Sequence, residues 1–435
     1  MLGRQFPQSL LERLLPSGHR AGVELAELQK LDLVVVSAGP GDPRVSFKHA
    51  LTQEAAYGEV PADRRRELHG VAARVLEEVH AQRREEVIDT LAFHHERSGD
   101  AARAVELPPP VRDATQLDLA NRLAHVLSIS GQYQEGLELL TAQAALVADL
   151  QRADLSSPYH FWLGYLNSLL AHHDEADAHA RQAITLARAA GRTAIEGRAL
   201  FVLAREAFFR CLFPDGVESG RQAVALLDGA GEHWWLGQAH WVVGINQLFM
   251  GQLDACLESE ARAADLGKLL GDARLKAYAR WTAGFAHAIA GDGAAAIASC
   301  RDAFDHSPDP VNTALARGFL GFAHATAGDP TTAVAHLERT VDELARFGLH
   351  KQGGTFRAFL AEAILATGDP ARARVQARLA LRVCSDAAFP FGAAWAERVL
   401  GRLAAREGAA PAAAELLDRA SATFDRIGAE LERAR

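Results

Sequence analysis

Metal-binding residue types are densest at positions 172–179, where the sequence reads His-His-Asp-Glu-Ala-Asp-Ala-His. Imidazole and carboxylate groups are among the side chains that hold zinc in proteins. The segment coincides, however, with a helix-to-helix turn of the repeat described below, where polar side chains are expected to face solvent. Two further histidines, His287 and His324, recur at one repeat position, which indicates duplication more than ligation. We therefore predict no metal site.

Catalytic arrangements cannot be read from the sequence either. No Ser/His/Asp or Cys/His set can be assembled at a shared site. No G-x-x-x-x-G-K-[S/T] sequence is present to hold the phosphates of a nucleotide. The four cysteines have neither disulfide nor metal spacing and fit small core residues in a reducing cytoplasm: Cys211, Cys256, Cys300 and Cys384. These features predict a non-enzymatic, cytoplasmic protein without a cofactor.

Composition narrows the range of partners. The formal net charge of −9 argues against broad nucleic-acid binding, which depends on neutralising phosphates. No apolar run approaches the roughly 20 residues that a membrane-spanning helix needs. We therefore expect neither a nucleic acid nor a membrane as a partner.

A repeat of about 40 residues organises most of the chain. In eight copies a small residue is followed twelve positions later by another small residue. The first set is Ala124, Gly164, Ala204, Gly244, Gly284, Gly321, Ala361 and Gly401. The second set is Gly136, Ala176, Gly216, Cys256, Ala296, Ala333, Ala373 and Ala413. Such phasing indicates that two helices of each copy approach closely at the small residues.

Glycines mark the turns between these helices, because glycine permits the left-handed conformation that ends a helix. Five such turns stand at Gly131, Gly251, Gly291, Gly328 and Gly368. The pattern resembles tetratricopeptide repeats, lengthened from about 34 residues to about 40. We predict an all-α fold, a tetratricopeptide-like α-solenoid in which about eight helix pairs over residues 113–435 form a right-handed superhelix.

The first 107 residues follow a different pattern. Residues 1–60 predict two helices and a β-hairpin, the outline of a winged-helix-like module that is truncated at its start. Residues 61–107 are expected to form a helical linker with one imperfect repeat, and prolines within 108–112 interrupt the helical run. A winged helix often binds DNA, but the helix before the hairpin carries Glu24 and Glu27. A helix in the major groove needs cations and amides, so we expect no direct DNA binding.

Three stretches carry a resemblance to a known family. Residues 47–57 read Phe-Lys-His-Ala-Leu-Thr-Gln-Glu-Ala-Ala-Tyr, residues 64–69 read Arg-Arg-Arg-Glu-Leu-His, and residues 91–105 include His-His-Glu-Arg-Ser-Gly-Asp. They resemble the regulatory half of bacterial STAND-class signalling ATPases. These include ATPase-linked adenylate/guanylate cyclases and large maltose-activator-like transcriptional regulators. The resemblance implies a P-loop ATPase domain on a separate or missing polypeptide, because this chain has no phosphate-binding loop.

The same resemblance suggests a nucleotide sensor. His49 occupies a place similar to that of a winged-helix histidine that contacts bound ADP in such ATPases. The alternative is a histidine that caps the following helix and packs locally, and we favour it because the chain lacks a nucleotide pocket.

An aromatic ladder is the strongest indication of a binding surface. Phe161, Phe201, Trp241 and Trp281 stand three residues before the first small residue of copies two to five. One helical turn later come Tyr165, Arg205 and Phe285. These positions face the concave groove in ordinary tetratricopeptide repeats, yet their apolar spacing also fits a core stripe. Both interpretations stay open.

The sequence therefore predicts a non-enzymatic sensor or interaction module of a signalling or transcription-regulatory protein. It would bind a protein, a peptide or a small inducer in its groove. The alternative is a regulatory subunit or fragment of a P-loop ATPase or nucleotide cyclase whose catalytic domains lie elsewhere.

Overall fold

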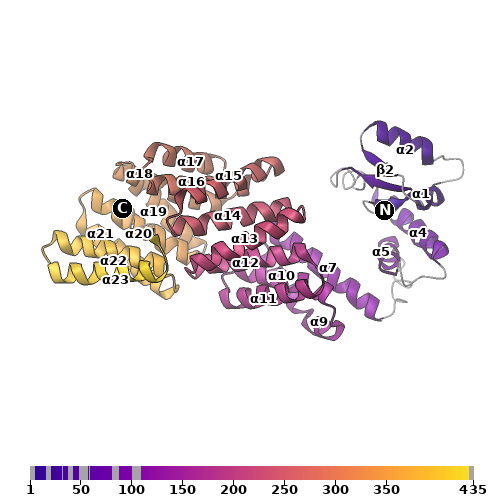
Figure 1. Ribbon diagram of the computed structural model, residues 1–435, viewed down its shortest axis with the longest axis horizontal. Helices are drawn as coiled ribbons and strands as arrows, with labels where there is room; N and C mark the ends of the chain where they lie inside the picture. Colours follow the sequence, from indigo (N-terminus) through magenta and orange to yellow (C-terminus); the bar gives the residue numbers. More distant parts are fainter. Residues whose placement is uncertain are drawn as a thin grey trace. The chain divides into compact units, whose positions relative to one another are not determined.

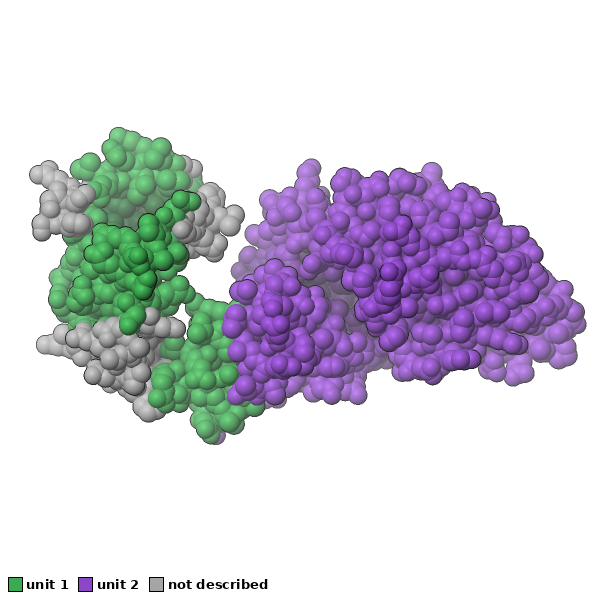
Figure 2. Space-filling view, turned by 180° about the vertical axis from the view of Figure 1, so that it is seen from behind, with its two compact units in different colours: residues 1–122, 143–150 green, residues 123–142, 151–435 purple. Residues whose placement is uncertain are grey.

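The computed structural model describes residues 5–15, 21–31, 33–37, 43–48, 57, 59–80, 88–99 and 109–430. The sensor candidate His49 lies outside these residues. The chain divides into two compact units (Figure 2): unit 1 comprises residues 1–122 and 143–150, and unit 2 comprises residues 123–142 and 151–435. The division falls within helix α7 (Pro109–Ile129), which begins inside the proline-rich stretch 108–112.

Unit 1 begins with a small antiparallel sheet. Its strands pair in the order β1-β3-β2: β1 (Gln5–Pro7), β2 (Val34–Ser37) and β3 (Arg44–Phe47). Two helices lie between β1 and β2 in the chain, α1 (Gln8–Leu14) and α2 (Ala21–Lys30). The buried core consists of Phe6, Leu25, Val34 and Val45. The predicted order of helix, helix and hairpin is confirmed, and β1 is an additional strand.

Two further helices of unit 1 pack against each other, α4 (Ala62–Val79) and α5 (Ile88–Ser98). Two buried imidazoles meet between them, with Nδ1 of His69 and Nδ1 of His94 2.8 Å apart. Burial lowers the pKa of each ring to about 4. Both rings are therefore neutral at pH 7, and the N–H of one donates to the other. Both histidines belong to the stretches that resemble STAND-class proteins.

Unit 2 contains seven regular antiparallel helix pairs within its described residues 151–430, one for each of copies two to eight (Figure 1). The pairs are α10 (Ala153–Leu169) with α11 (His173–Ala189), α12 (Thr193–Phe209) with α13 (Phe213–Gly229), α14 (His233–Phe249) with α15 (Leu253–Leu270), α16 (Ala273–Ile289) with α17 (Gly293–Asp305), α18 (Pro310–Thr326) with α19 (Pro330–Arg346), α20 (His350–Ala366) with α21 (Pro370–Asp386), and α22 (Pro390–Arg406) with α23 (Ala410–Arg426).

Copy one is irregular. Helix α7 is followed by two short helices, α8 (Tyr133–Thr141) and α9 (Ala144–Leu150), where the other copies have one long helix. The tetratricopeptide-like solenoid predicted from the repeat is nevertheless confirmed, with copies two to eight in the predicted register. Among the described residues, no helix is both long and apolar enough to cross a membrane.

The paired small residues lie where the two helices of a copy touch. A Cβ atom added to Gly164 of α10 would stand 3.1 Å from the backbone nitrogen of Ala180 and 3.2 Å from the carbonyl oxygen of Ala176, both in α11. At Gly284 of α16 the carbonyl oxygen of Ala296 would lie at 3.1 Å. The helix backbones are therefore in contact, and the predicted close approach is confirmed.

The turns between paired helices use a left-handed residue in every regular copy. Glycine takes this conformation at the predicted turns, for example with φ of 70° at Gly251. Two copies have no glycine there, and Ala171 and Cys211 adopt φ values of 62° and 58°. Ala388, in the connection between copies seven and eight, is likewise left-handed with φ of 50°. A Cβ atom crowds the carbonyl oxygen in this region, which costs roughly 1–2 kcal/mol per residue.

We expect Ala171→Gly to raise the free energy of unfolding by about 1 kcal/mol, because glycine adopts the left-handed turn without this crowding. Urea denaturation of the two proteins measures the difference. Ala180→Gly, inside α11, is the matched control and should destabilise. Equal destabilisation by both changes would contradict the expectation.

Helices that are four repeats apart also meet within unit 2. Nζ of Lys351, in α20, donates to the carbonyl oxygen of Phe209, in α12, at 3.0 Å. The rings of Phe249, in α14, and Phe391, in α22, have centroids 4.6 Å apart. Further buried rings pack against one another beside these contacts: Phe285, Phe322, Phe359 and Trp395. The solenoid therefore closes on itself between copies three and four and copies seven and eight, and aromatic side chains fill the space between them.

Candidate functional site

Four residues of the aromatic ladder are buried. The exposed fraction of the residue is 0% for Phe161, 1% for Phe201, 3% for Trp281 and 2% for Phe285. These rings cannot be reached by a partner in this structure. For these four residues the groove interpretation is corrected, and the core interpretation holds.

The reason is the packing between the first helices of successive copies. The ring centroids of Tyr165 and Phe201 are 6.3 Å apart, and those of Trp281 and Phe319 are 5.9 Å apart. A ring on one first helix thus covers the ring on the next. Because a core stripe and a groove stripe share the same helical spacing, only the structure separates them.

The other three predicted residues, Tyr165, Arg205 and Trp241, remain partly exposed. They lie beside residues that the sequence did not indicate. Burial raises the pKa of the Tyr165 phenol, and the charges of Arg205 and Arg274 act against this, while the phenols of Tyr278 and Tyr133 act with it. These electrostatic effects indicate that the other four side chains lie in the neighbourhood of Tyr165. Together with Trp241 they form what we call the Tyr165 cluster, which draws on copies one to five.

Aromatic stacking orders one side of the Tyr165 cluster. The rings of Trp241 and Tyr278 stack with centroids 4.7 Å apart and planes inclined by 29°. The indole Nε1 of Trp241 donates to Oγ1 of Thr282 at 3.3 Å. The two rings are thereby fixed with their outer parts exposed.

A buried carboxylate supports the other side. Nη1 of Arg205 donates to Oγ of Ser168 at 2.7 Å, and this hydroxyl donates in turn to Oε1 of Glu206. The second oxygen of Glu206 lies 2.6 Å from Nδ1 of His173. The chain of hydrogen bonds holds the Arg205 guanidinium in place, and its plane also lies over the ring of Phe209 at 5.3 Å.

The histidines of the segment 172–179 have separate partners. His172 contacts Oδ1 of Asn167 at 3.1 Å, His173 contacts Glu206, and Nδ1 of His179 lies 3.1 Å from Nδ1 of His160. The structure therefore does not bring the residues of this segment together, and within the described part of the chain no group of three or more His, Cys, Asp or Glu could hold a metal.

The Tyr165 cluster has the chemistry to hold a carboxylate. Guanidinium groups form short, charge-assisted hydrogen bonds with carboxylates. Burial raises the pKa of Tyr165 and of Tyr278, so both phenols keep their proton at neutral pH and can donate. Asp309 already pairs with Arg274, at 3.3 Å, whereas Arg205 forms no ion pair with an acidic side chain among the described residues.

The missed members had a weak signal in the sequence. Tyr278 stands three residues before Trp281, so it lies one turn away on the same helix as a ladder residue. Arg274 and Tyr133 stand in the first turn of α16 and of α8. These are not the repeat positions at which the aromatic ladder recurs. Only the curvature of the stacked copies brings these residues together.

Similar solved structures share the fold. A Rap protein complexed with competence and sporulation factor is 14% identical, with a TM-score of 0.57 over 85% of this chain and 100% of that one. The Rap conjugation gene regulator of plasmid pLS20, in complex with the Phr* peptide, is 14% identical, with a TM-score of 0.52 over 72% of this chain and 96% of that one. A STAND protein with a tetratricopeptide repeat sensor from Pyrococcus horikoshii is 12% identical, with a TM-score of only 0.43 over 97% of this chain and 61% of that one.

No protein-family model matches the chain, and neither does any curated protein sequence. The likeness to the two Rap structures establishes the tetratricopeptide-like solenoid. The likeness to the STAND protein is too low to assign a family.

Proposed function

We propose that unit 2 is a peptide-binding regulatory module and that the Tyr165 cluster is its ligand site. The ligand would place a carboxylate against Arg205 and the phenols of Tyr165 and Tyr278, and an apolar or aromatic side chain against Trp241. The observation that carries the proposal is the convergence of these partly exposed donors in a protein whose net charge is −9.

Two further observations support this function. Tryptophan, tyrosine and arginine are the residue types that dominate binding hot spots. A solenoid of the same fold, the Rap regulator of pLS20, has been solved with a peptide bound.

A larger assembly is compatible with the same site. We propose that the chain acts as the regulatory part of a STAND-class signalling protein, with a P-loop ATPase or cyclase as its partner polypeptide. The support is the resemblance of residues 64–69 and 91–105, whose histidines His69 and His94 meet between α4 and α5. The winged-helix-like module belongs to this proposal, as does a small inducer as ligand. A sensor role of His49 would require the partner polypeptide to supply the nucleotide pocket.

The test uses the full chain and a library of random peptides displayed on phage. We expect selection to enrich peptides with a free C-terminal or side-chain carboxylate next to an aromatic residue. Arg205→Gln and Trp241→Ala should each weaken binding of a selected synthetic peptide at least about 10-fold, the effect of losing a hot spot of ~2 kcal/mol.

Arg378→Gln, an exposed position on α21, is the matched control and should leave the affinity unchanged. Enrichment of no sequence class, or equal binding by wild type and the Arg205 variant, would reject the Tyr165 cluster as the site. Thermal melting of each variant separates loss of contact from loss of fold.

A further inference from the structure

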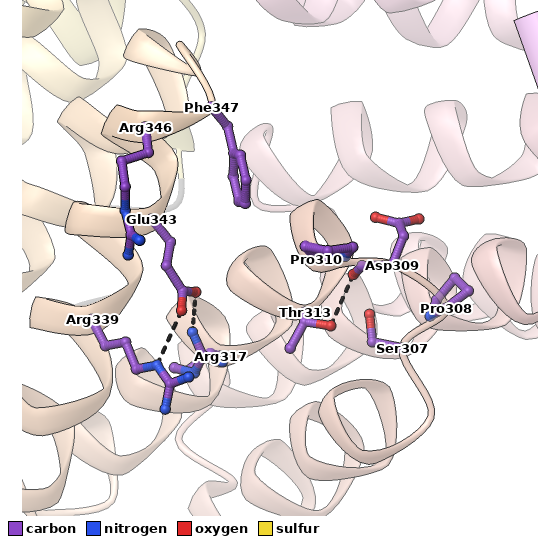
Figure 3. Close-up of a pocket in the computed structure, with 10 residues that line it drawn as sticks. All are labelled: Ser307, Pro308, Asp309, Pro310, Thr313, Arg317, Arg339, Glu343, Arg346 and Phe347. Atoms are coloured by element: carbon purple, nitrogen blue, oxygen red, sulfur yellow. Dashed lines mark hydrogen bonds and ion pairs between the residues drawn. The ribbon is translucent and has the colours of Figure 1, made fainter. Parts of the chain in front are cut away.

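Helix α17 ends about one turn early. It has 13 residues, whereas the second helices of the following copies, α19 and α21, have 17. The sequence shows the same deletion, because 37 positions separate Gly284 from Gly321 and 40 separate Gly244 from Gly284. A cavity of about 470 Å³ lies beyond this end, between the α17–α18 connection and helices α18 and α19 (Figure 3).

Three arginines line one wall of the cavity with a single glutamate. Glu343 of α19 accepts hydrogen bonds from Arg317 and, at 3.0 Å, from Arg339. Burial raises the pKa of Glu343, but the hydrogen bonds from Arg339 and Arg317 outweigh it, so the net shift is downward and the group stays ionised. Nε of Arg346 donates to the backbone oxygen of Asp342 at 3.3 Å, and its guanidinium group lines the same cavity (Figure 3).

The wall formed by the α17–α18 connection contributes one acidic side chain, Asp309. Asp309 caps α18 by accepting from the backbone nitrogen of Asn312 at 2.9 Å, and it pairs with Arg274 at 3.3 Å. The capped helix end is thus occupied by its own aspartate. The cavity is therefore lined by three guanidinium groups and two carboxylates, of which Asp309 is already paired with Arg274.

Neutral groups complete the cavity. The ring of Phe347 is 41% exposed and projects from the end of α19 into the space between the arginines and the α17–α18 connection (Figure 3). Oγ of Ser307 is buried without a hydrogen-bond partner among the described residues. Phe347 offers an apolar contact, and Ser307 offers a donor.

We propose that this cavity binds a small organic anion, with its carboxylate or phosphate group held by Arg339 and Arg346 and its apolar part packed on Phe347. Arg317 is 5% exposed and lies over the ring of Phe304 at 5.2 Å, so it fixes Glu343 and the cavity wall. The volume falls within the roughly 300–1,000 Å³ typical of ligand sites and exceeds what a bare phosphate needs. The residues proposed to hold this anion are not members of the Tyr165 cluster, although the Asp309–Arg274 ion pair connects the two sites.

Titration calorimetry on the full chain tests the proposal with four probes: benzoate, phenyl phosphate, inorganic phosphate and neutral benzyl alcohol. We expect saturable binding of benzoate or phenyl phosphate, and the stronger of the two identifies the anionic group. Arg339→Gln and Arg346→Gln, both on the exposed face of α19, should each weaken that binding about 10-fold or more, and Phe347→Ala should weaken it as well.

The control is again Arg378→Gln, which should not change the affinity. Inorganic phosphate that binds as tightly as phenyl phosphate would overturn the proposal, because it would indicate an adventitious ion only. The absence of saturable binding by every anion would also overturn it. Peptide binding at the Tyr165 cluster should persist in the Arg339 and Arg346 variants, so the two proposals fail independently.

Discussion

Replacing Trp281 with alanine is expected to lower the free energy of unfolding by about 3–5 kcal/mol, the usual cost of removing a buried aromatic side chain. The ring is 3% exposed and packs with Ala303 and Ala316. Its nearest aromatic neighbours are Tyr278, with centroids 5.1 Å apart, and Phe319. Removing it would leave a cavity between the first helices of copies five and six that neither helix can fill without moving.

Trp241→Ala provides the comparison within one protein. Trp241 holds the equivalent repeat position in copy four, but its side chain is partly exposed, so the loss of stability should be clearly smaller. Urea denaturation followed by circular dichroism measures both. An equal loss for the two variants would show that repeat position decides the cost and that exposure does not.

Replacing Glu260 with glutamine is expected to remove a large part of the pH dependence of stability. Glu260 is 1% exposed, and neither carboxyl oxygen has a hydrogen-bond partner among the described residues. It lies against the backbone of α14, where a Cβ atom on Gly244 would stand 2.3 Å from Oε1. Other copies place small or apolar residues at this repeat position: Leu140, Ala180, Gly220, Cys300, Leu337, Ala377 and Leu417.

The sign of the effect follows from proton linkage. Burial raises the pKa of Glu260 well above its ordinary value, so the folded protein keeps a proton that the unfolded chain releases above pH 4–5. Stability is therefore highest below the unfolded pKa, and it falls as pH rises, by about 1.4 kcal/mol per pH unit, until the folded pKa is reached. Glutamine cannot ionise, so the slope contributed by this residue should vanish.

Urea midpoints between pH 4.5 and pH 8.5 check this expectation. The Glu260→Gln variant should exceed the wild type most at the alkaline end, with the difference shrinking toward pH 4.5. Glu258→Gln, an exposed neighbour on α15, should run parallel to the wild type. Parallel profiles for Glu260→Gln and wild type would mean that the group is ionised in the folded protein.

The phase of the helix pairs was predictable because close contact between backbones demands a small residue at a fixed place. Gly164 and Gly284 could not carry a side chain without separating their helices. The turns at Ala171, Cys211 and Ala388 were not marked by glycine, since packing of the flanking helices imposes the left-handed conformation there. The shortened α17 was legible as a 37-residue spacing, but the cavity beside it depends on side chains from α18 and α19.

The candidate site was only partly predictable. Tyr165, Arg205 and Trp241 were singled out, but the same criterion also selected Phe161 and Trp281, which are buried. The position of a residue within the sequence repeat does not determine which face of its helix the next copy buries. That depends on the rotation between copies, which is a property of the whole array.

Closure of the solenoid changes how its end behaves. Arrays whose copies touch only their nearest neighbours lose helix pairs one at a time from the termini, because each terminal pair is held by a single interface. Here α22 is also held by the Phe249–Phe391 contact, and α20 by the bond from Lys351 to Phe209. Fraying of the last pair must therefore break contacts in copy four. The last helix pair is therefore stabilised by contacts on more than one side, as a pair inside the array is.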